Sequence, residues 1–270
     1  MRTLTFLSLA ALLAAGCGWK SDGLERLEEL YPTPEAPPVE PEPVDRCALP
    51  NDAEGSVSVG GTCDAGLASG RWAVRFVEYG SMKPMGSPWD LRLTDLFLAQ
   101  PSADKQSVEL TFCDQLSHLA QPSGTAVEMG KTKMSAKTRE ALGRTKLVLP
   151  LDASGTFSAQ DVAWVWGAKG LANPATDAMP TKASDPLLFD EDQDGNPGVT
   201  VQVMNPAGYR FMARRSVFDF GGGKASADGR YVTGTLTFAV TENAVGATNA
   251  LLLTVAPITA RTECTNVYQQ

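Results

Sequence analysis

Trp72-Ala-Val-Arg-Phe-Val-Glu-Tyr79 carries aromatic and β-branched side chains at alternate positions. Because successive side chains of a β-strand point to opposite faces of a sheet, this period of two predicts a strand with one face in a core. Stretches with similar enrichment, bounded by Gly, Pro, Asn or Asp, predict further strands. These lie at 91–98, 108–113, 146–149, 162–166, 199–204, 209–220, 231–241 and 251–258.

The folded part of the chain, 46–270, is therefore expected to be one all-β domain. Helical signal is confined to 135–142 (SAKTREAL), which predicts one short helix. Exposed strand edges invite aggregation, so the strands must close into a barrel or stack as a sandwich. The core is expected to contain the following aromatic residues, which in a barrel interior would instead bind an apolar or sugar ligand: Trp164, Trp166, Phe211, Phe218 and Phe238.

Two features favour the barrel. Gly70-Arg71-Trp72 opens the first long strand, and Arg261 follows the last one. This arrangement resembles the lipocalin kernel, in which a Gly-X-Trp is covered by an Arg from the end of the last strand. The resemblance implies that the guanidinium of Arg261 stacks on the indole of Trp72 and closes one end of a single antiparallel, lipocalin-like barrel with long loops. A β-sandwich, with Trp72 as an ordinary core residue, is the alternative.

The chain begins with the pattern of a secretory signal. Met1-Arg2 is positive, 4–15 is almost wholly apolar, and the small residues Ala14-Ala15-Gly16 lead into Cys17. The apolar run is shorter than the roughly 20 residues that span a bilayer as a helix. The site resembles the lipobox of bacterial lipoproteins, although Ala14 stands where that motif usually has Leu. An ordinary signal peptide that happens to contain a Cys is the alternative.

The lipobox resemblance implies a location as well as a modification. The signal 1–16 would be removed, and Cys17 would carry the acyl chains that hold the protein at the membrane. Gly18, rather than Asp, follows the modified Cys. Under the enterobacterial sorting rule this indicates a lipid-anchored protein of the bacterial cell envelope, in the outer membrane.

An acidic, proline-rich tether is expected at 17–45. Between Lys20 and Asp45 the chain has eight acids and two bases, and 31–43 alternates proline with acidic residues. Proline fixes φ and donates no hydrogen bond, so this composition predicts an extended, solvated spacer. A proline-rich recognition ligand is the alternative. The remaining domain has 23 acids and 20 bases, so no basic field exists to recruit nucleic acid.

Four cysteines remain besides Cys17: Cys47, Cys63, Cys113 and Cys264. An even number in an exported protein indicates two disulfides, and four cysteines allow three connectivities. The preferred pairing is Cys47 with Cys63 and Cys113 with Cys264. A zinc site is the rival, but the sequence has no CxxC pair and one histidine, His118.

The stretch Phe189-Asp-Glu-Asp-Gln-Asp-Gly-Asn-Pro-Gly198 carries aspartates at alternate positions before a glycine. Alternate carboxylates converge on an ion, and the glycine permits a sharp bend. The run resembles the Asp-x-Asp-x-Asp-Gly calcium loops of EF-hand, dockerin and thrombospondin type 3 segments. The resemblance implies a structural Ca²⁺ site, with a further ligand from Asp185 or water: Asp190, Asp192 and Asp194 as side-chain ligands and Asn196 as a carbonyl ligand. Val201 stands where an EF-hand has its bidentate Glu. A solvated acidic turn is the alternative.

The sequence predicts a non-enzymatic protein, because no catalytic set or nucleophile elbow is present. Two roles remain open for the calcium-stabilised domain. One is a lipocalin-like carrier or sensor of a small apolar ligand. The other is a structural or adhesive cell-surface protein that binds another macromolecule of the envelope. A cavity with an open mouth would favour the first role, and a filled core with an exposed apolar patch would favour the second.

Overall fold

The computed structural model describes residues 71–104, 106–127, 130–151, 157, 159–225 and 232–269. All of them lie in one compact unit, Val44–Gln270. The predicted signal peptide, the tether and three of the cysteines, Cys17, Cys47 and Cys63, lie outside the described residues.

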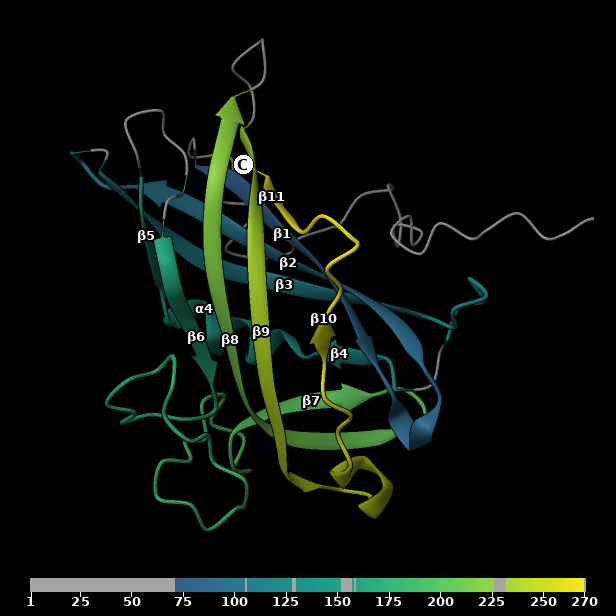
Figure 1. The fold of residues 1–270 in the computed structure, drawn as a ribbon. Helices are drawn as coiled ribbons and strands as arrows, with labels where there is room; N and C mark the ends of the chain where they lie inside the picture. Colours follow the sequence, from purple (N-terminus) through teal and green to yellow (C-terminus); the bar gives the residue numbers. More distant parts are fainter. Residues whose placement is uncertain are drawn as a thin grey trace, which may run out of the picture. The chain divides into compact units, whose positions relative to one another are not determined.

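The described part of the chain is mostly β-strand, with one α-helix (Figure 1). In chain order the elements are β1 (Trp72–Met82), η1 (Pro84–Gly86), β2 (Trp89–Pro101), β3 (Ser107–Ala120), β4 (Thr132–Met134), α4 (Ala136–Arg144), β5 (Leu147–Pro150), β6 (Ala159–Trp166), β7 (Val199–Val203), β8 (Gly208–Ala225), β9 (Val232–Ala247), η2 (Ala250–Leu253), β10 (Thr259–Ala260) and β11 (Val267–Gln269).

All strand pairs between these elements are antiparallel. The strand order is β4-β7-β8-β9-β11-β1-β2-β3-β5, while β6 pairs with β8 and β10 with β1. The sheet curls into two half-barrels, so that β8 and β9 lie in front of β1, β2 and β3 (Figure 1). The all-β prediction is confirmed. A closed lipocalin barrel is not, because among the described strands no ladder joins β5 to β6 or β4.

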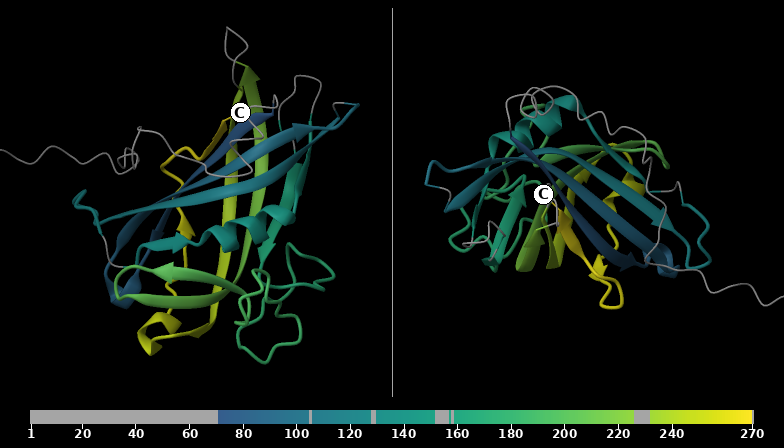
Figure 2. Two further views of the ribbon diagram at one scale, coloured as in Figure 1. Left: turned by 180° about the vertical axis from the view of Figure 1, so that it is seen from behind. Right: turned by 90° about the horizontal axis from the view of Figure 1, so that it is seen from above.

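The predicted helix is confirmed as α4. Ser135 precedes it, and its hydroxyl accepts a 3.0 Å hydrogen bond from the backbone N–H of Thr138. This is the usual N-cap arrangement, which satisfies an otherwise free donor of the first turn. Seen from behind, α4 lies between β3 and β7 (Figure 2), and it contacts both strands. The helix therefore covers the side of the sheet where these strands are not paired.

The predicted strand at 251–258 is wrong. The apolar run Leu251-Leu252-Leu253 lies in η2, and only the short β10 follows it. Asn249 causes the difference, because its side chain accepts a 3.0 Å hydrogen bond from the N–H of Leu251 and caps a turn. The other predicted strand stretches lie in or overlap β-strands.

The core joins the two half-barrels through aromatic contacts. The ring of Phe76 in β1 lies 5.4 Å from that of Phe218 in β8, and Phe97 in β2 lies 5.2 Å from Trp164 in β6. These contacts place side chains, rather than a central ligand cavity, in this part of the interior. Of the predicted core residues, Trp164, Trp166, Phe218 and Phe238 are in this cluster. Phe211 is half-buried in a smaller separate cluster.

The predicted contact between Trp72 and Arg261 is wrong. The backbone N–H of Arg261 donates a 2.9 Å hydrogen bond to the carbonyl of Tyr79. Trp72 is seven residues earlier in the same strand, which corresponds to roughly 23 Å at about 3.3 Å per residue. Trp72 is 43% exposed, and the buried guanidinium of Arg261 instead pairs with Asp90 at 3.1 Å and Glu263 at 2.7 Å.

The preferred pairing of Cys113 with Cys264 does not fit this topology. Cys113 is in β3, whereas Cys264 lies in the segment between β10 and β11, which both pair with β1. Strands β1 and β2 separate the two cysteines within the sheet. Neighbouring strands are about 4.8 Å apart, so the separation is roughly 14 Å, beyond the Cα···Cα span of about 4.4–6.8 Å in a disulfide.

Candidate functional site

The aspartate loop lies directly before β7 and is shaped by backbone conformations that favour glycine. Gly195 and Gly198 have φ of 89° and 84°, and Gln193 has φ of 53°. A Cβ at Gly198 would lie 2.3 Å from the carbonyl oxygen of Met212 in β8, so this position admits only glycine. Gly195 instead has open space around it. The loop therefore packs directly against the backbone of β8 at Gly198, whereas Gly195 is at a turn with open space around it.

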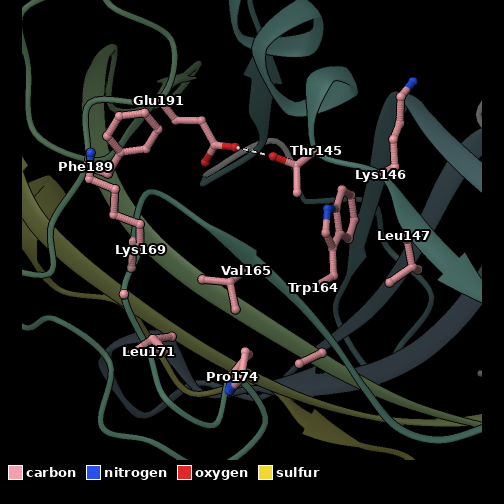
Figure 3. Close-up of a pocket in the computed structure, with 13 residues that line it drawn as sticks. Thr145, Lys146, Leu147, Trp164, Val165, Lys169, Leu171, Pro174, Phe189 and Glu191 are labelled. Carbon is pink, nitrogen blue, oxygen red and sulfur yellow. Dashed lines mark hydrogen bonds between the residues drawn. The ribbon is translucent and has the colours of Figure 1, made fainter.

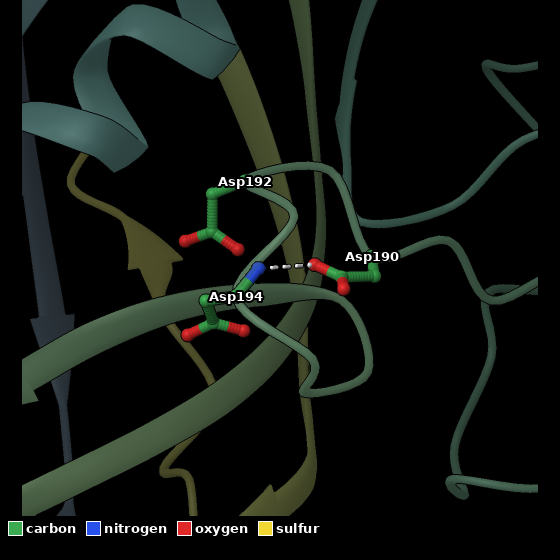
Figure 4. A group of neighbouring side chains, drawn as sticks. All are labelled: Asp190, Asp192 and Asp194. Carbon is green, nitrogen blue, oxygen red and sulfur yellow. Dashed lines mark hydrogen bonds between the residues drawn. The ribbon is translucent and has the colours of Figure 1, made fainter.

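The predicted metal ligands Asp190, Asp192 and Asp194 come together. Each offers a carboxylate oxygen within 4.8 Å of the others (Figure 4). Asp190 also accepts backbone hydrogen bonds from the N–H groups of Asp194 (3.2 Å) and Gly195 (2.9 Å), which bends the loop back on itself. This convergence matches the prediction, although the group contains neither Asp185 nor a fourth acidic residue among those described.

Asp192 is the most buried of the three, with an exposed fraction of 3%. Its Oδ2 accepts hydrogen bonds from the hydroxyl of Thr138 (2.9 Å) and the N–H of Thr200 (3.2 Å). Its Oδ1 is buried without a hydrogen-bond partner among the described residues. Burial, the largest cause, raises the pKa of Asp192, and the neighbouring Asp194 and Asp190 carboxylates raise it further. An oxygen in this setting is stabilised by a cation or a proton.

Asp194 is the exposed member of the group. Burial would raise the pKa of Asp194, but hydrogen bonds from Thr200 and Asn196 outweigh it and lower the pKa overall. The backbone N–H of Asn196 donates to Oδ1 of Asp194 at 2.8 Å. Asn196 thus belongs to the same turn as Asp194, and its role as a carbonyl ligand stays a prediction.

Chemically, the group supplies hard oxygen ligands. Ca²⁺ takes six to eight oxygens at about 2.3–2.6 Å, so three carboxylates need carbonyl or water oxygens to complete the shell. Val201, at the place of an EF-hand glutamate, is buried in β7. The side chain of Val201 has no ligand atom to offer, so a Ca²⁺ ion at this group would need its remaining ligands from the turn or from water.

Glu191 was missed as a site residue by the sequence reasoning. Its carboxylate accepts hydrogen bonds from the N–H of Gly167 (2.7 Å) and the hydroxyl of Thr145 (3.3 Å). Burial raises its pKa, partly offset by these bonds. The alternation of side chains along the loop could have indicated the position of Glu191, because the side chain between two converging aspartates must point away from them.

A pocket of about 340 Å³ lies on the side of the loop toward which Glu191 points (Figure 3). Most of its lining is apolar, with Lys146, Lys169 and Glu191 as the charged members. The ammonium of Lys169 lies 4.0 Å from the centre of the Phe189 ring, a cation–π contact. The other lining residues are Thr145, Leu147, Ala163, Trp164, Val165, Ala168, Gly170, Leu171 and Pro174.

The helix α4 connects the aspartate loop to this pocket. At its start, the Lys137 ammonium donates a 2.6 Å hydrogen bond to the carbonyl of Gln193, and Thr138 binds Asp192. At its end, Thr145 is the residue after α4 and lines the pocket. Phe189 and Glu191, which flank Asp190, line the pocket directly. The pocket wall and the aspartate group are thus parts of one local structure.

Within the described residues, no helix is long and apolar enough to cross a membrane. The chain matches no protein-family model, no curated protein and no solved structure.

Proposed function

We propose that this chain is a lipid-anchored, non-catalytic binding protein of the bacterial cell envelope. Calcium on Asp190, Asp192 and Asp194 holds the loop in place, and the loop forms one wall of a pocket for a small apolar ligand. The observation that carries the proposal is that Phe189 and Glu191 line the pocket while the alternate residues of the same loop converge as carboxylates. Ligand binding then depends on the metal.

Electrostatics favours a cation at the aspartate group. Two unit charges about 5 Å apart repel by roughly 3 kcal/mol at an effective dielectric constant near 20, and less where solvent screens them. The repulsion matters most at Asp192, whose Oδ1 is buried and unpartnered among the described residues. Oxygen ligands alone suit calcium better than zinc or copper, which prefer nitrogen and sulfur.

The lining of the pocket sets the class of ligand. Trp164, Val165, Leu171 and Phe189 offer apolar surface, and pockets of this type gain affinity from burial of an apolar ligand. Lys169 is in the same lining, with its ammonium 4.0 Å from the centre of the Phe189 ring, whereas the ammonium of Lys146 donates to the hydroxyl of Thr111 at 2.6 Å. A small apolar molecule with one anionic end group satisfies both features. This ligand site borders the aromatic core at Trp164 and is lined on its other sides by the loop residues Phe189 and Glu191.

The test measures binding of the apolar anion 1-anilinonaphthalene-8-sulfonate to the full chain with calcium and with chelator. We expect saturable binding that weakens about tenfold when calcium is removed, because the loop wall is then no longer held. Asp192→Asn should reproduce the effect of chelator. Asp104→Asn is the matched control, since Asp104 forms a similar turn hydrogen bond to Ser102 (2.6 Å) far from the loop in sequence.

A pocket variant separates the two parts of the proposal. Val165→Glu places a charge in the apolar lining and should abolish dye binding while calcium binding, measured by calorimetry, persists. Dye binding that survives this substitution would place the ligand elsewhere. If calcium titrated into the protein produces no heat of binding and does not stabilise the fold, the proposed calcium site is contradicted.

The anchor is tested at Cys17. The proposed acylation requires its thiol, so Cys17→Ser should abolish palmitate labelling and move the protein from the detergent to the aqueous phase. Labelling that persists in this variant would overturn the lipid anchor without affecting the pocket.

An exposed apolar surface supports a second candidate, the adhesive role. Leu251 and Leu253 of η2 are 74% and 49% exposed, and Met204 and Tyr209 at the β7–β8 hairpin are 50% and 48% exposed. The hairpin and the start of η2 are joined by a 3.0 Å hydrogen bond from the Thr248 N–H to the Tyr209 carbonyl. Such patches mark protein interaction sites. Leu251→Ser with Leu253→Ser should abolish crosslinking to an envelope protein if this role holds.

A further inference from the structure

Exposed apolar side chains of the described residues gather at one end of the fold. Of the six large ones, Met204 and Tyr209 are on the β7–β8 hairpin, and Leu251 and Leu253 are in η2. These four residues are named the end patch. The β7–β8 turn, the olive η2 and the β1–β2 turn lie at the same end of the sheet in both side views (Figures 1 and 2).

Hydrogen bonds join the two parts of the end patch. The N–H of Tyr209 donates to the hydroxyl of Thr248 at 2.9 Å, and the N–H of Thr248 donates to the carbonyl of Tyr209 at 3.0 Å. Nε of Arg210 donates a 2.8 Å bond to the carbonyl of Leu252, whose side chain is buried. Leu252 therefore fixes η2 on the sheet, while its two neighbouring leucines are exposed.

Lysines border the end patch on the side of β4. Lys133 is opposite Gln202, and Gln202 is opposite Tyr209, so the side chains of all three are on one face of the sheet. Continuing this register, Lys131 is opposite Met204, whose N–H donates to the Lys131 carbonyl at 2.9 Å. Exposed apolar side chains and lysines thus share the outward face of β4, β7 and β8.

A third lysine comes from the β1–β2 turn. Lys83 is exposed and is the first residue after β1. Across the turn, the ring of Trp89 would lie 3.5 Å from a Cβ at Gly130. The N–H of Gly130 donates a 2.6 Å hydrogen bond to the carbonyl of Asn205, the residue after Met204. The β1–β2 turn therefore adjoins the β7–β8 turn.

The charge at the end patch is opposite to that of the whole chain, which has 31 acidic and 23 basic residues. The four described segments that carry the patch and its lysines contain no Asp or Glu: 81–89, 130–137, 199–210 and 243–262. Lysine is depleted in interfaces between proteins. Apolar side chains beside lysines are instead typical of surfaces that bind anionic bilayers.

We propose that the end patch docks on the surface of a bilayer that contains anionic lipids. Its four apolar side chains enter the boundary between headgroups and acyl chains, and the neighbouring lysines contact the lipid phosphates. A bilayer suits both the apolar residues and the lysines, so it is favoured over the envelope protein of the second candidate function. This docking requires neither the calcium loop nor the pocket nor acylation of Cys17.

Vesicle flotation of the chain from Gly18 to Gln270 tests the proposal. This chain keeps the whole compact unit Val44–Gln270 but lacks Cys17 and the apolar segment before it, so that neither contributes to binding. Circular dichroism verifies its strand content. We expect binding to vesicles of equal parts phosphatidylcholine and phosphatidylglycerol, and at least about tenfold weaker binding to phosphatidylcholine alone. Salt at about 1 M should release the protein, because the Debye length falls to about 3 Å.

Leu251→Ser with Leu253→Ser tests the apolar part of the end patch. We expect binding to the anionic vesicles to weaken by at least about tenfold, because less apolar area leaves water. Val148→Ser is the matched control, since Val148 is 59% exposed on β5 and should not contact the bilayer.

Lys83→Gln with Lys133→Gln tests the charge, and should weaken binding to the anionic vesicles by about tenfold or more. Arg71→Gln with Arg75→Gln is the control, because both arginines are exposed at the other end of β1. Equal binding to the two kinds of vesicle, or unchanged binding in both test variants, overturns the proposal. It is also overturned if vesicles never bind while the leucine variant abolishes self-association in sedimentation equilibrium or crosslinking to an envelope protein.

Discussion

The hydroxyl of Thr138, in the first turn of α4, donates a 2.9 Å hydrogen bond to Oδ2 of Asp192 in the aspartate loop. Both residues are buried, at 0% and 3% exposure. The two residues are 54 positions apart in the chain, so this bond is a tertiary contact that joins the helix to the loop. Burial raises the pKa of Asp192, and the hydrogen bond from Thr138 lowers it, so this bond favours the charged carboxylate against the effect of burial.

Thr138→Val tests this link, because valine keeps the shape and removes the hydroxyl. We expect a loss of about 1–3 kcal/mol in the free energy of unfolding, since a buried carboxylate loses a donor. Calcium should restore part of the loss by binding the freed carboxylate. Urea unfolding with and without calcium measures both effects. Thr237→Val is the control, because Thr237 donates a longer 3.3 Å bond to Asp219 at an exposed site and should change stability little.

The two loop glycines should respond differently to alanine. At both Gly195 and Gly198 the positive φ costs an alanine about 1–2 kcal/mol. At Gly198 the new Cβ also meets the Met212 carbonyl at 2.3 Å, so the backbone must shift. We expect Gly198→Ala to lower the melting temperature further than Gly195→Ala and to abolish calcium stabilisation. Equal losses in the two variants would show that the loop is not held against β8.

Sheet topology makes a prediction about the cysteines. Because β1 and β2 separate Cys113 from Cys264, we predict that each pairs with one of Cys47 and Cys63. Peptide mapping of the unreduced protein distinguishes this pattern from the one favoured by spacing. A peptide that links Cys113 to Cys264 would contradict the register of β1, β2 and β3.

Local features were predictable from the sequence because local interactions determine them. The alternation at 72–79 gave β1, Ser135 gave the start of α4, and the spacing of Asp190, Asp192 and Asp194 gave their convergence. Short strands such as β4, with three residues, have too few positions to show a period. Their existence depends on the partner strand.

Long-range relations were not predictable. Trp72 and Arg261 fit a known motif, yet the C-terminal segment pairs with the far end of β1 because β11 occupies the near end. The Gln115 amide that bridges Asp95 and Arg214 joins residues 20 and 99 positions away in the chain. No periodicity reports such a contact, since it requires the two half-barrels to face each other. For Glu191, the alternation of the loop indicates that its side chain points away from the aspartates, but not that a pocket lies on that side.

The fully buried carboxyl of Glu78 should make stability depend on pH. Burial first, and then Asp95, raise the pKa of Glu78, so the folded state holds a proton that the unfolded chain releases near its ordinary pKa. The stability from this proton is complete below the unfolded pKa, near 4.5, and is lost as pH rises through the folded pKa. Over that window one extra bound proton lowers the free energy of unfolding by about 1.4 kcal/mol per pH unit.

Glu78→Gln should therefore flatten the pH profile of stability measured by urea unfolding between pH 5 and 9. The amide keeps the shape of the protonated acid but cannot lose a proton, so the variant should exceed the wild type in stability increasingly toward alkaline pH. Burial also raises the pKa of Asp95, Glu191 and Asp192. These three groups contribute to the pH dependence of stability in both the wild type and the variant. Glu109→Gln should leave the profile unchanged. A parallel profile for Glu78→Gln would mean that Glu78 is already ionised in the folded state, stabilised by Arg214 without a shared proton.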